Sequence, residues 1–226
     1  MVRLPRGCYS DDSQLRLATG RAIRPDGFDV EAFAKVELPV WLSYLLGPGK
    51  ASRVAARNLS KRGVEWFSST FRGWSQSGGN GASMRIQPHV WASPDPSDEL
   101  TFLPDVIRNS VSTHSHPTGI MGAVIHAFVL ARTMATGRML LPEDVLSCVD
   151  VAARVPDIIR ADNELGSHWL GVFERECGSF DEAWAKALRR CGRAIRAAGQ
   201  RIPGEGPAER YGGIIDRLGL RESRPA

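Results

Sequence analysis

The sequence PTGIMGAVIHAFVLARTMA, residues 117–135, predicts a long helix at the centre of the fold. Pro117 suits the first position of a helix, where its missing N–H group costs no hydrogen bond. The most apolar part, 120–131, is far shorter than the roughly 20 residues that span a bilayer, and it contains His126. We therefore expect a core helix of a soluble protein. Small residues along it would let neighbouring helices pack closely: Gly119, Gly122, Ala123 and Ala127.

The rest of the chain also has helical periodicity, and no series of alternating apolar and polar residues predicts a sheet. The fold class is therefore all-α, with a single domain over residues 1–226. The other expected helices are 11–23, 30–46, 51–61, 82–90, 105–112, 141–154, 180–198 and 208–218. Turns are expected at 25–27, at 47–49, at Gly166 and at Gly178, with a glycine-rich loop over 73–81.

Composition excludes several classes of protein. The formal net charge is +4 with acidic residues spread along the chain, so a nucleic-acid partner is not indicated, although an anionic ligand would suit it. The four cysteines show no CxxC pairing, which argues against a zinc knuckle or a disulfide framework and favours the cytoplasm. No secretory signal is recognised at the N-terminus, and no membrane partner is expected.

Ser10, Asp11 and Asp12 place one hydroxyl and two carboxylates at a predicted helix start. Ser10 is a good N-cap residue, and acidic side chains in the first turn complement the helix dipole. Adjacent oxygen ligands can also supply part of the octahedral shell of Mg²⁺. Local pattern leaves both interpretations open.

The block GGNGASMR, residues 78–85, precedes another predicted helix. Glycines allow unusual backbone angles and close approach, so the N–H groups around Asn80 could hold a phosphate or ribose hydroxyls. The alternative is a surface linker with a turn at Asn80. Trp74 and Trp91 flank this loop, and they are either core residues or walls of a base pocket.

The turn THSHP, residues 113–117, leads into the central helix. The imidazoles and the hydroxyls of Thr113 or Ser115 could donate to a pyrophosphate at the helix start. Alternatively, His114 and His116 bind nearby carbonyl groups at a helix entry. His126, further along, is expected to be a core or groove residue.

Together these three blocks resemble the ADP-ribosylglycohydrolase family. Its bacterial members carry a Tyr-Ser-Asp-Asp-Thr-Gln-like helix start, a Gly-Asn-Gly-x-x-Met-Arg loop and a Thr-His-x-His-Pro turn in this order. The matching segments here are 9–14, 79–85 and 113–117, and further likeness lies in 36–41 and 105–108. The resemblance covers most of the chain.

The resemblance implies a compact, all-helical enzyme that holds two Mg²⁺ ions and hydrolyses the bond joining ADP-ribose to an acceptor. Ser10, Asp11 and Asp12 would be metal ligands, and both aspartates would be catalytic. The ribose and phosphates would be bound by Gly79, Asn80, Gly81 and Ala82, and the pyrophosphate by Thr113, His114 and His116.

Two features of the family are not recognised in this sequence: an N-terminal helix with a Gly-Asp motif, and a C-terminal Asp-Thr-Asp-Thr-type block. The implied domain is incomplete at both ends, and so is the metal site. Two functions follow. The chain is a hydrolase, with a second polypeptide supplying the missing ligands, or it is a truncated, non-catalytic member that binds ADP-ribose or a nucleotide, or is inert. The acceptor is left open.

Overall fold

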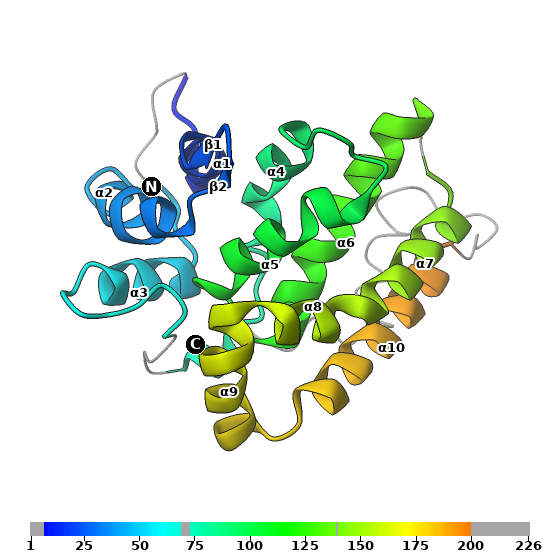
Figure 1. The fold of residues 1–226 in the computed structure, drawn as a ribbon. Coiled ribbons are helices and arrows are strands. Elements are labelled where there is room, and N and C mark those ends of the chain that lie inside the picture. The colour runs from blue at the N-terminus through cyan, green and yellow to red at the C-terminus, as the bar shows by residue number, and fades with distance from the viewer. Residues whose placement is uncertain (1–6, 69–72, 139, 200–226) are drawn as a thin grey trace.

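The computed structural model describes residues 7–68, 73–138 and 140–199, and these residues are mostly helical (Figure 1). The elements, in which η marks short 3-10 or π helices, are α1 (Asp11–Arg21), β1 (Ile23–Arg24), β2 (Gly27–Phe28), η1 (Ala32–Glu37), α2 (Leu38–Trp41), α3 (Lys50–Leu59), η2 (Trp74–Gln76), η3 (Ser83–Arg85), α4 (Gln87–Trp91), η4 (Glu99–Thr101), α5 (Leu103–Val111), α6 (Pro117–Thr136), α7 (Pro142–Val151), η5 (Ala152–Arg154), α8 (Val155–Ala161), η6 (Leu165–Trp169), α9 (Leu170–Cys177) and α10 (Phe180–Gly199). The all-α prediction is confirmed for this part of the chain.

Helix α6 occupies the centre of the molecule, as its sequence predicts (Figure 1). It contacts α4, α5, α7, α10 and η3, and its small residues Gly119, Ala123 and Ala127 are buried against these neighbours. Gly137 ends it in the left-handed conformation, at φ 64°, that glycine adopts most easily. Within the described residues, α6 alone is long and apolar enough to cross a membrane, a test that the core helix of a soluble protein also passes.

The predicted turn at 25–27 is a small hairpin. Strands β1 and β2 pair antiparallel, with Ile23 opposite Phe28 and Arg24 opposite Gly27. Gly27 has a φ of 130°, which a residue with a side chain rarely adopts. The expectation of no sheet is therefore wrong at this one place, because two residues per strand are too few to produce an alternating pattern.

The helix predicted over 30–46 is shorter and less regular than expected. A π-helical segment, η1, is followed by α2, which ends at Trp41. The wider π turn precedes Pro39, which has no N–H group and whose ring would clash with the carbonyl four residues earlier in a regular helix. The indole of Trp41 is fully buried and donates to Gln14 Oε1 at 2.8 Å, which ties α2 to α1.

The region between Arg154 and Phe180 contains helices that the sequence analysis missed. Elements α8, η6 and α9 fill it, and Gly166 lies inside η6 where a turn was expected. A Cβ at Gly166 would lie 2.4 Å from the backbone oxygen of Arg160, so glycine is required here for close packing. The turn at Gly178 is confirmed, with a φ of 82°. Aromatic side chains join α9, α10 and η6 in one cluster: Trp169, Phe173, Phe180 and Trp184.

The remaining expectations about the fold have simple outcomes. The predicted helix over 208–218 lies outside the described residues, and the single-domain prediction stays a prediction. The predicted glycine-rich loop is interrupted by η2, whose Trp74 is buried and donates to Glu176 Oε2 at 3.0 Å. Trp74 is therefore a core residue, and Trp91 is 53% exposed; neither lines the cavity described below.

Candidate functional site

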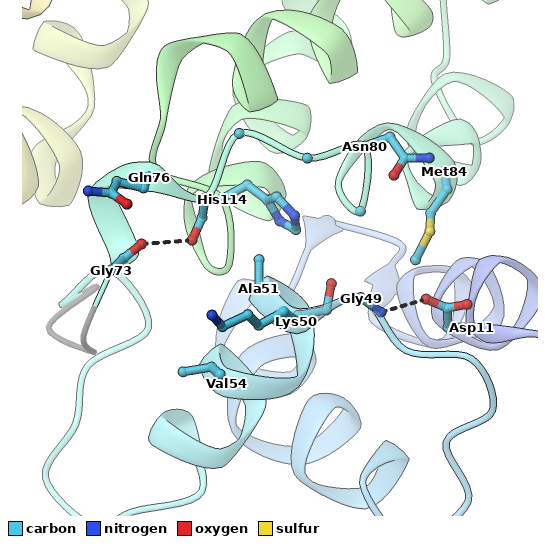
Figure 2. A pocket seen from close by; sticks show the side chains of 15 residues that line it. Asp11, Gly49, Lys50, Ala51, Val54, Gly73, Gln76, Asn80, Met84 and His114 are labelled. Atoms are coloured by element: carbon cyan, nitrogen blue, oxygen red, sulfur yellow. Dashed lines mark hydrogen bonds between the residues drawn. The ribbon is translucent and has the colours of Figure 1, made fainter. Parts of the chain in front are cut away.

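Segments that are far apart in the sequence meet around one cavity of about 390 Å³. The start of α1 contributes Asp11, the loop after η2 contributes Gly79, Asn80 and Gly81, and the turn before α6 contributes His114. Figure 2 shows the imidazole of His114 lying between this loop and the first turn of α3. The three sequence blocks thus converge on one place, which is the geometry that a shared site requires.

Asp11 is the acidic group of this cavity. It is the first residue of α1 and only 6% exposed, and its Oδ2 accepts a hydrogen bond from the backbone N–H of Gly49 at 3.3 Å (Figure 2). Burial raises the pKa of Asp11, and the Gly49 hydrogen bond opposes that shift. No ion pair to Asp11 is found among the described residues. Its buried charge is therefore not balanced by a basic side chain in this part of the protein.

The two neighbours of Asp11 do not line the cavity. Ser10 and Asp12 are exposed, and the hydroxyl of Ser10 donates to Asp12 Oδ2 at 2.9 Å. Ser10 occupies the N-cap position, but its side chain accepts no helix N–H, so the predicted capping bond is absent. The side chains of Ser10 and Asp12 therefore hydrogen-bond to each other at the start of α1, while Asp11 faces the cavity.

The loop 78–81 is close to the imidazoles, and this proximity explains its glycines. A Cβ at Gly81 would lie 2.7 Å from His114 Cε1, and one at Gly78 would lie 3.1 Å from His116 Nδ1. None of Gly78, Gly79 and Gly81 has a positive φ, so the unusual backbone angles that were expected are not found there. Gly78 and Gly81 are needed for space, whereas a Cβ at Gly79 would meet nothing within 4 Å. Ala82 is fully buried and lies outside the cavity wall.

His114 is almost completely buried, with 2% of its surface exposed, yet it lines the cavity. Burial lowers its pKa to about 3, so the ring is neutral at physiological pH. Its Nδ1 lies 2.7 Å from the hydroxyl oxygen of Thr113. Thr113 itself is fully buried and does not reach the cavity, because its hydroxyl is engaged by His114 and by Arg85. Any effect of Thr113 on a ligand would therefore act through His114.

His116 and His126 lie outside the cavity wall. His116 is the N-cap residue of α6, and its Nδ1 accepts from the N–H of Thr118 at 3.1 Å. His126 is on the outer side of α6, where its Nε2 lies 2.9 Å from the amide nitrogen of Gln87. His116 therefore caps a helix, as the alternative interpretation expected. Of the two histidines in the turn, His114 is the one placed to contact a ligand in the cavity.

The first turn of α3 completes the cavity, and the sequence analysis did not foresee it. Gly49, Lys50, Ala51 and Ser52 line the wall opposite the glycine-rich loop. The first N–H groups of a helix have no partner within it, so they can bind an anion. The hydroxyl of Ser52 is buried and has no hydrogen-bond partner among the residues that the structure describes. The signal was available: the breaker at 47–49 is followed directly by lysine, alanine and serine.

Comparison with known proteins identifies the family of this chain. The family model for ADP-ribosylglycohydrolase matches residues 2–220, and the chain belongs to this family. A similar curated protein is the ADP-ribosyl-[dinitrogen reductase] glycohydrolase of Rhodospirillum rubrum. The two are 29% identical over 147 residues, which cover 61% of this chain and 47% of the relative. The match thus spans about half the length of that relative.

The family resemblance implies Mg²⁺, and the donor set fits a weakly held ion. Asp11 supplies a buried carboxylate, and within the described part of the chain no basic side chain pairs with it, so a cation would balance its charge. Asp12 and Ser10 add oxygen atoms at the same helix start. Across residues 7–68, 73–138 and 140–199 there is no group of three or more His, Cys, Asp or Glu side chains arranged to hold a metal ion.

Proposed function

We propose that this protein hydrolyses the glycosidic bond between ADP-ribose and a modified acceptor. The observation that carries the proposal is the single cavity shared by Asp11, the loop 79–81 and His114. The Rhodospirillum rubrum relative is named as a glycohydrolase, which supports the same reaction class. The acceptor, whether a protein side chain, a nucleic-acid base or a small molecule, is left open.

The walls of the cavity suit the two chemical halves of ADP-ribose. Lys50 and the first N–H groups of α3, which have no acceptor within the helix, offer positive potential to the two phosphates. Asn80 presents both a donor and an acceptor, which matches ribose hydroxyl groups. Because Gly79 and Asn80 are exposed at the rim, a bulky acceptor attached to the ribose can remain outside.

Asp11 is the residue that we assign closest to the chemistry, with Asp12 beside it. Both carboxylates and Ser10 would hold Mg²⁺, which when bound can polarise a water molecule and orient ribose hydroxyls. The carboxylates can also take a proton from the attacking water and stabilise the positive charge that develops at the anomeric carbon. The glycine-rich loop and His114 would fix the ligand so that this carbon faces Asp11.

Calorimetric titration of ADP-ribose, with and without Mg²⁺, tests binding, and release of ADP-ribose from a modified substrate tests turnover. We expect binding that tightens with Mg²⁺, together with release. Binding without release would favour the second candidate function, a non-catalytic member of the family. This candidate is supported by the placement of Ser10 and Asp12 outside the cavity wall. Absence of both binding and release would reject both functions.

Release that appears only when a second polypeptide is added would support the proposed partner that supplies further metal ligands. We also propose the cytoplasm as the location, since Cys8 and Cys177 are exposed free thiols and Cys148 and Cys191 are unpaired too. Labelling of these thiols in freshly lysed cells tests this. Protected cysteines would contradict a reducing location.

A further inference from the structure

Arg85 is a buried arginine that no carboxylate balances among the described residues. It is 0% exposed, and its guanidinium lies 5.0 Å from the centre of the Phe33 ring. Its donors reach Asn109 Oδ1 at 2.7 Å and Asn109 O at 2.8 Å. They also reach Gly81 O at 3.1 Å and Thr113 Oγ1 at 2.7 Å. Arg85 thus joins the glycine-rich loop to the turn that carries His114.

The hydroxyl of Thr113 has a hydrogen that must find an acceptor. Since Arg85 has only donors, the oxygen of Thr113 accepts from it. Among the described residues, the partner left for the hydroxyl hydrogen is His114 Nδ1, at 2.7 Å. If Nδ1 carried the proton instead, the fully buried hydroxyl would keep an unpaired hydrogen, which is costly. The bond therefore runs from Thr113 to Nδ1, and Nδ1 is the acceptor.

A neutral imidazole has one proton, so an acceptor at Nδ1 places that proton on Nε2. We infer that Arg85 and Thr113 are positioning residues that hold His114 as the Nε2–H tautomer, and that this N–H is donated to an acceptor oxygen of the ligand. His114 then selects ligands by an oxygen acceptor such as a phosphate, and does not act as a general base through Nε2. The identity of the ligand rests on the proposed function; the tautomer does not.

The position of Nε2 agrees with this role. His114 lines the cavity, and a Cβ at Gly81 would lie 2.8 Å from Nε2, so this end of the ring faces the glycine-rich loop. The low pKa of His114, which burial lowers to about 3, keeps the ring from gaining a second proton at neutral pH. A fixed, neutral donor of this kind is ordered before the ligand arrives, which limits the entropy lost on binding.

Nitrogen NMR reads the tautomer directly in the free protein. Long-range ¹H–¹⁵N spectra of the histidine-labelled full chain should show His114 with its proton on Nε2, assigned by loss of the signals in His114→Asn. The Thr113→Val variant should lose this single tautomer, and Thr113→Ser should keep it. A proton on Nδ1 in the wild type, or an unchanged His114 spectrum in Thr113→Val, would overturn the inference.

Binding of ADP-ribose supplies the second readout. We expect Thr113→Val to weaken binding about tenfold, the effect of one hydrogen bond to a charged group, and Thr113→Ser to restore it. Thr133→Val is the matched control, because the hydroxyl of Thr133 donates to Val129 O within α6 and Thr133 lies outside the cavity. Equal affinity of Thr113→Val and Thr133→Val would overturn the inference. Failure of the wild type to bind ADP-ribose would reject the proposed function. The spectrum of the ligand-free protein would still test whether Thr113 sets the tautomer of His114.

Discussion

The start of α1 and the turn before α6 look alike in sequence and differ in structure. Each places polar residues at the beginning of a helix, and each sends one side chain into the cavity. At the start of α1 that side chain, Asp11, is a buried carboxylate with no basic partner in the described residues. At the turn it is His114, whose neighbours satisfy one another through a buried network.

This difference separates two tasks. The carboxylate of Asp11 carries a charge that the surrounding described residues do not neutralise, so the start of α1 needs a cation or a proton. In the turn before α6, Thr113 and Arg85 fix the ring of His114 without a ligand, so its Nε2–H is already placed to donate a hydrogen bond. The acidic helix start is suited to chemistry, and the turn is suited to recognition.

The largest expected effect is that of replacing Asp11, and comparison with Asp12 would show whether the two carboxylates have different roles. Asp11→Asn keeps the acceptor for Gly49 and removes the charge, so ADP-ribose release and magnesium affinity should fall by roughly a hundredfold. Asp12→Asn should have a smaller effect, since Asp12 is exposed. Magnesium titration and release assays on both variants measure this. Unchanged magnesium affinity in both would remove the metal assignment.

The next effect tests the space between the loop and His114. A Cβ in Gly81→Ala would meet the ring and Ser52 Oγ at 2.7 and 2.8 Å, so binding of ADP-ribose should weaken about tenfold and stability fall by about 1–3 kcal/mol. Gly79→Ala is the control, because a Cβ there meets nothing within 4 Å. Equal affinities for the two variants would show that the loop does not face the ligand.

A smaller effect distinguishes His116 from His114. His116→Ala removes the cap of α6 and should lower the free energy of unfolding by about 1 kcal/mol, whereas His116→Asn should keep it. Neither change should alter ADP-ribose affinity more than about twofold, a difference too small to represent a lost hydrogen bond. Denaturant unfolding and calorimetry provide the two numbers. A large loss of affinity in His116→Asn would place His116 in the site.

The smallest effect is on the protein without ligands. Because burial raises the pKa of Asp11, the folded state holds this proton more tightly than the unfolded chain. This proton stabilises the folded state at pH values below the pKa that Asp11 has in the unfolded chain. The stabilisation is lost as pH rises through the pKa that Asp11 has in the folded protein. At pH 7 and without Mg²⁺, Asp11→Asn should therefore melt at the same temperature as the wild type or slightly higher. A lower melting temperature would mean that the charge of Asp11 is already balanced.

Part of this structure could be predicted from sequence. Local signals located the start of α1 at Asp11 and of α6 at Pro117, and the order of the three blocks identified the family. What local signals could not supply was the direction of each side chain. Ser10, Asp12, Thr113 and His116 share motifs with cavity residues yet point elsewhere, because their partners are fixed by the helix start or by residues distant in sequence.

Glycines were the other source of error. Gly166 and Gly81 resemble turn residues in the sequence, but each serves a close contact with a segment that only the folded chain brings near. The helices α8 and α9 were missed for the same reason, since Gly166 suggested a break between them. The complete burial of Arg85, which bonds to Gly81 O in the glycine-rich loop, was not predicted from the sequence.

The convergence of α1, α3, the glycine-rich loop and the turn before α6 on one ligand is best tested by an NMR titration. ADP-ribose, added in the presence of Mg²⁺ to the ¹⁵N-labelled chain, should shift the backbone amides of Asp11, Lys50, Asn80 and His114 with one common dissociation constant. Shifts confined to one of these segments, or centred on a different part of the molecule, would contradict a shared cavity.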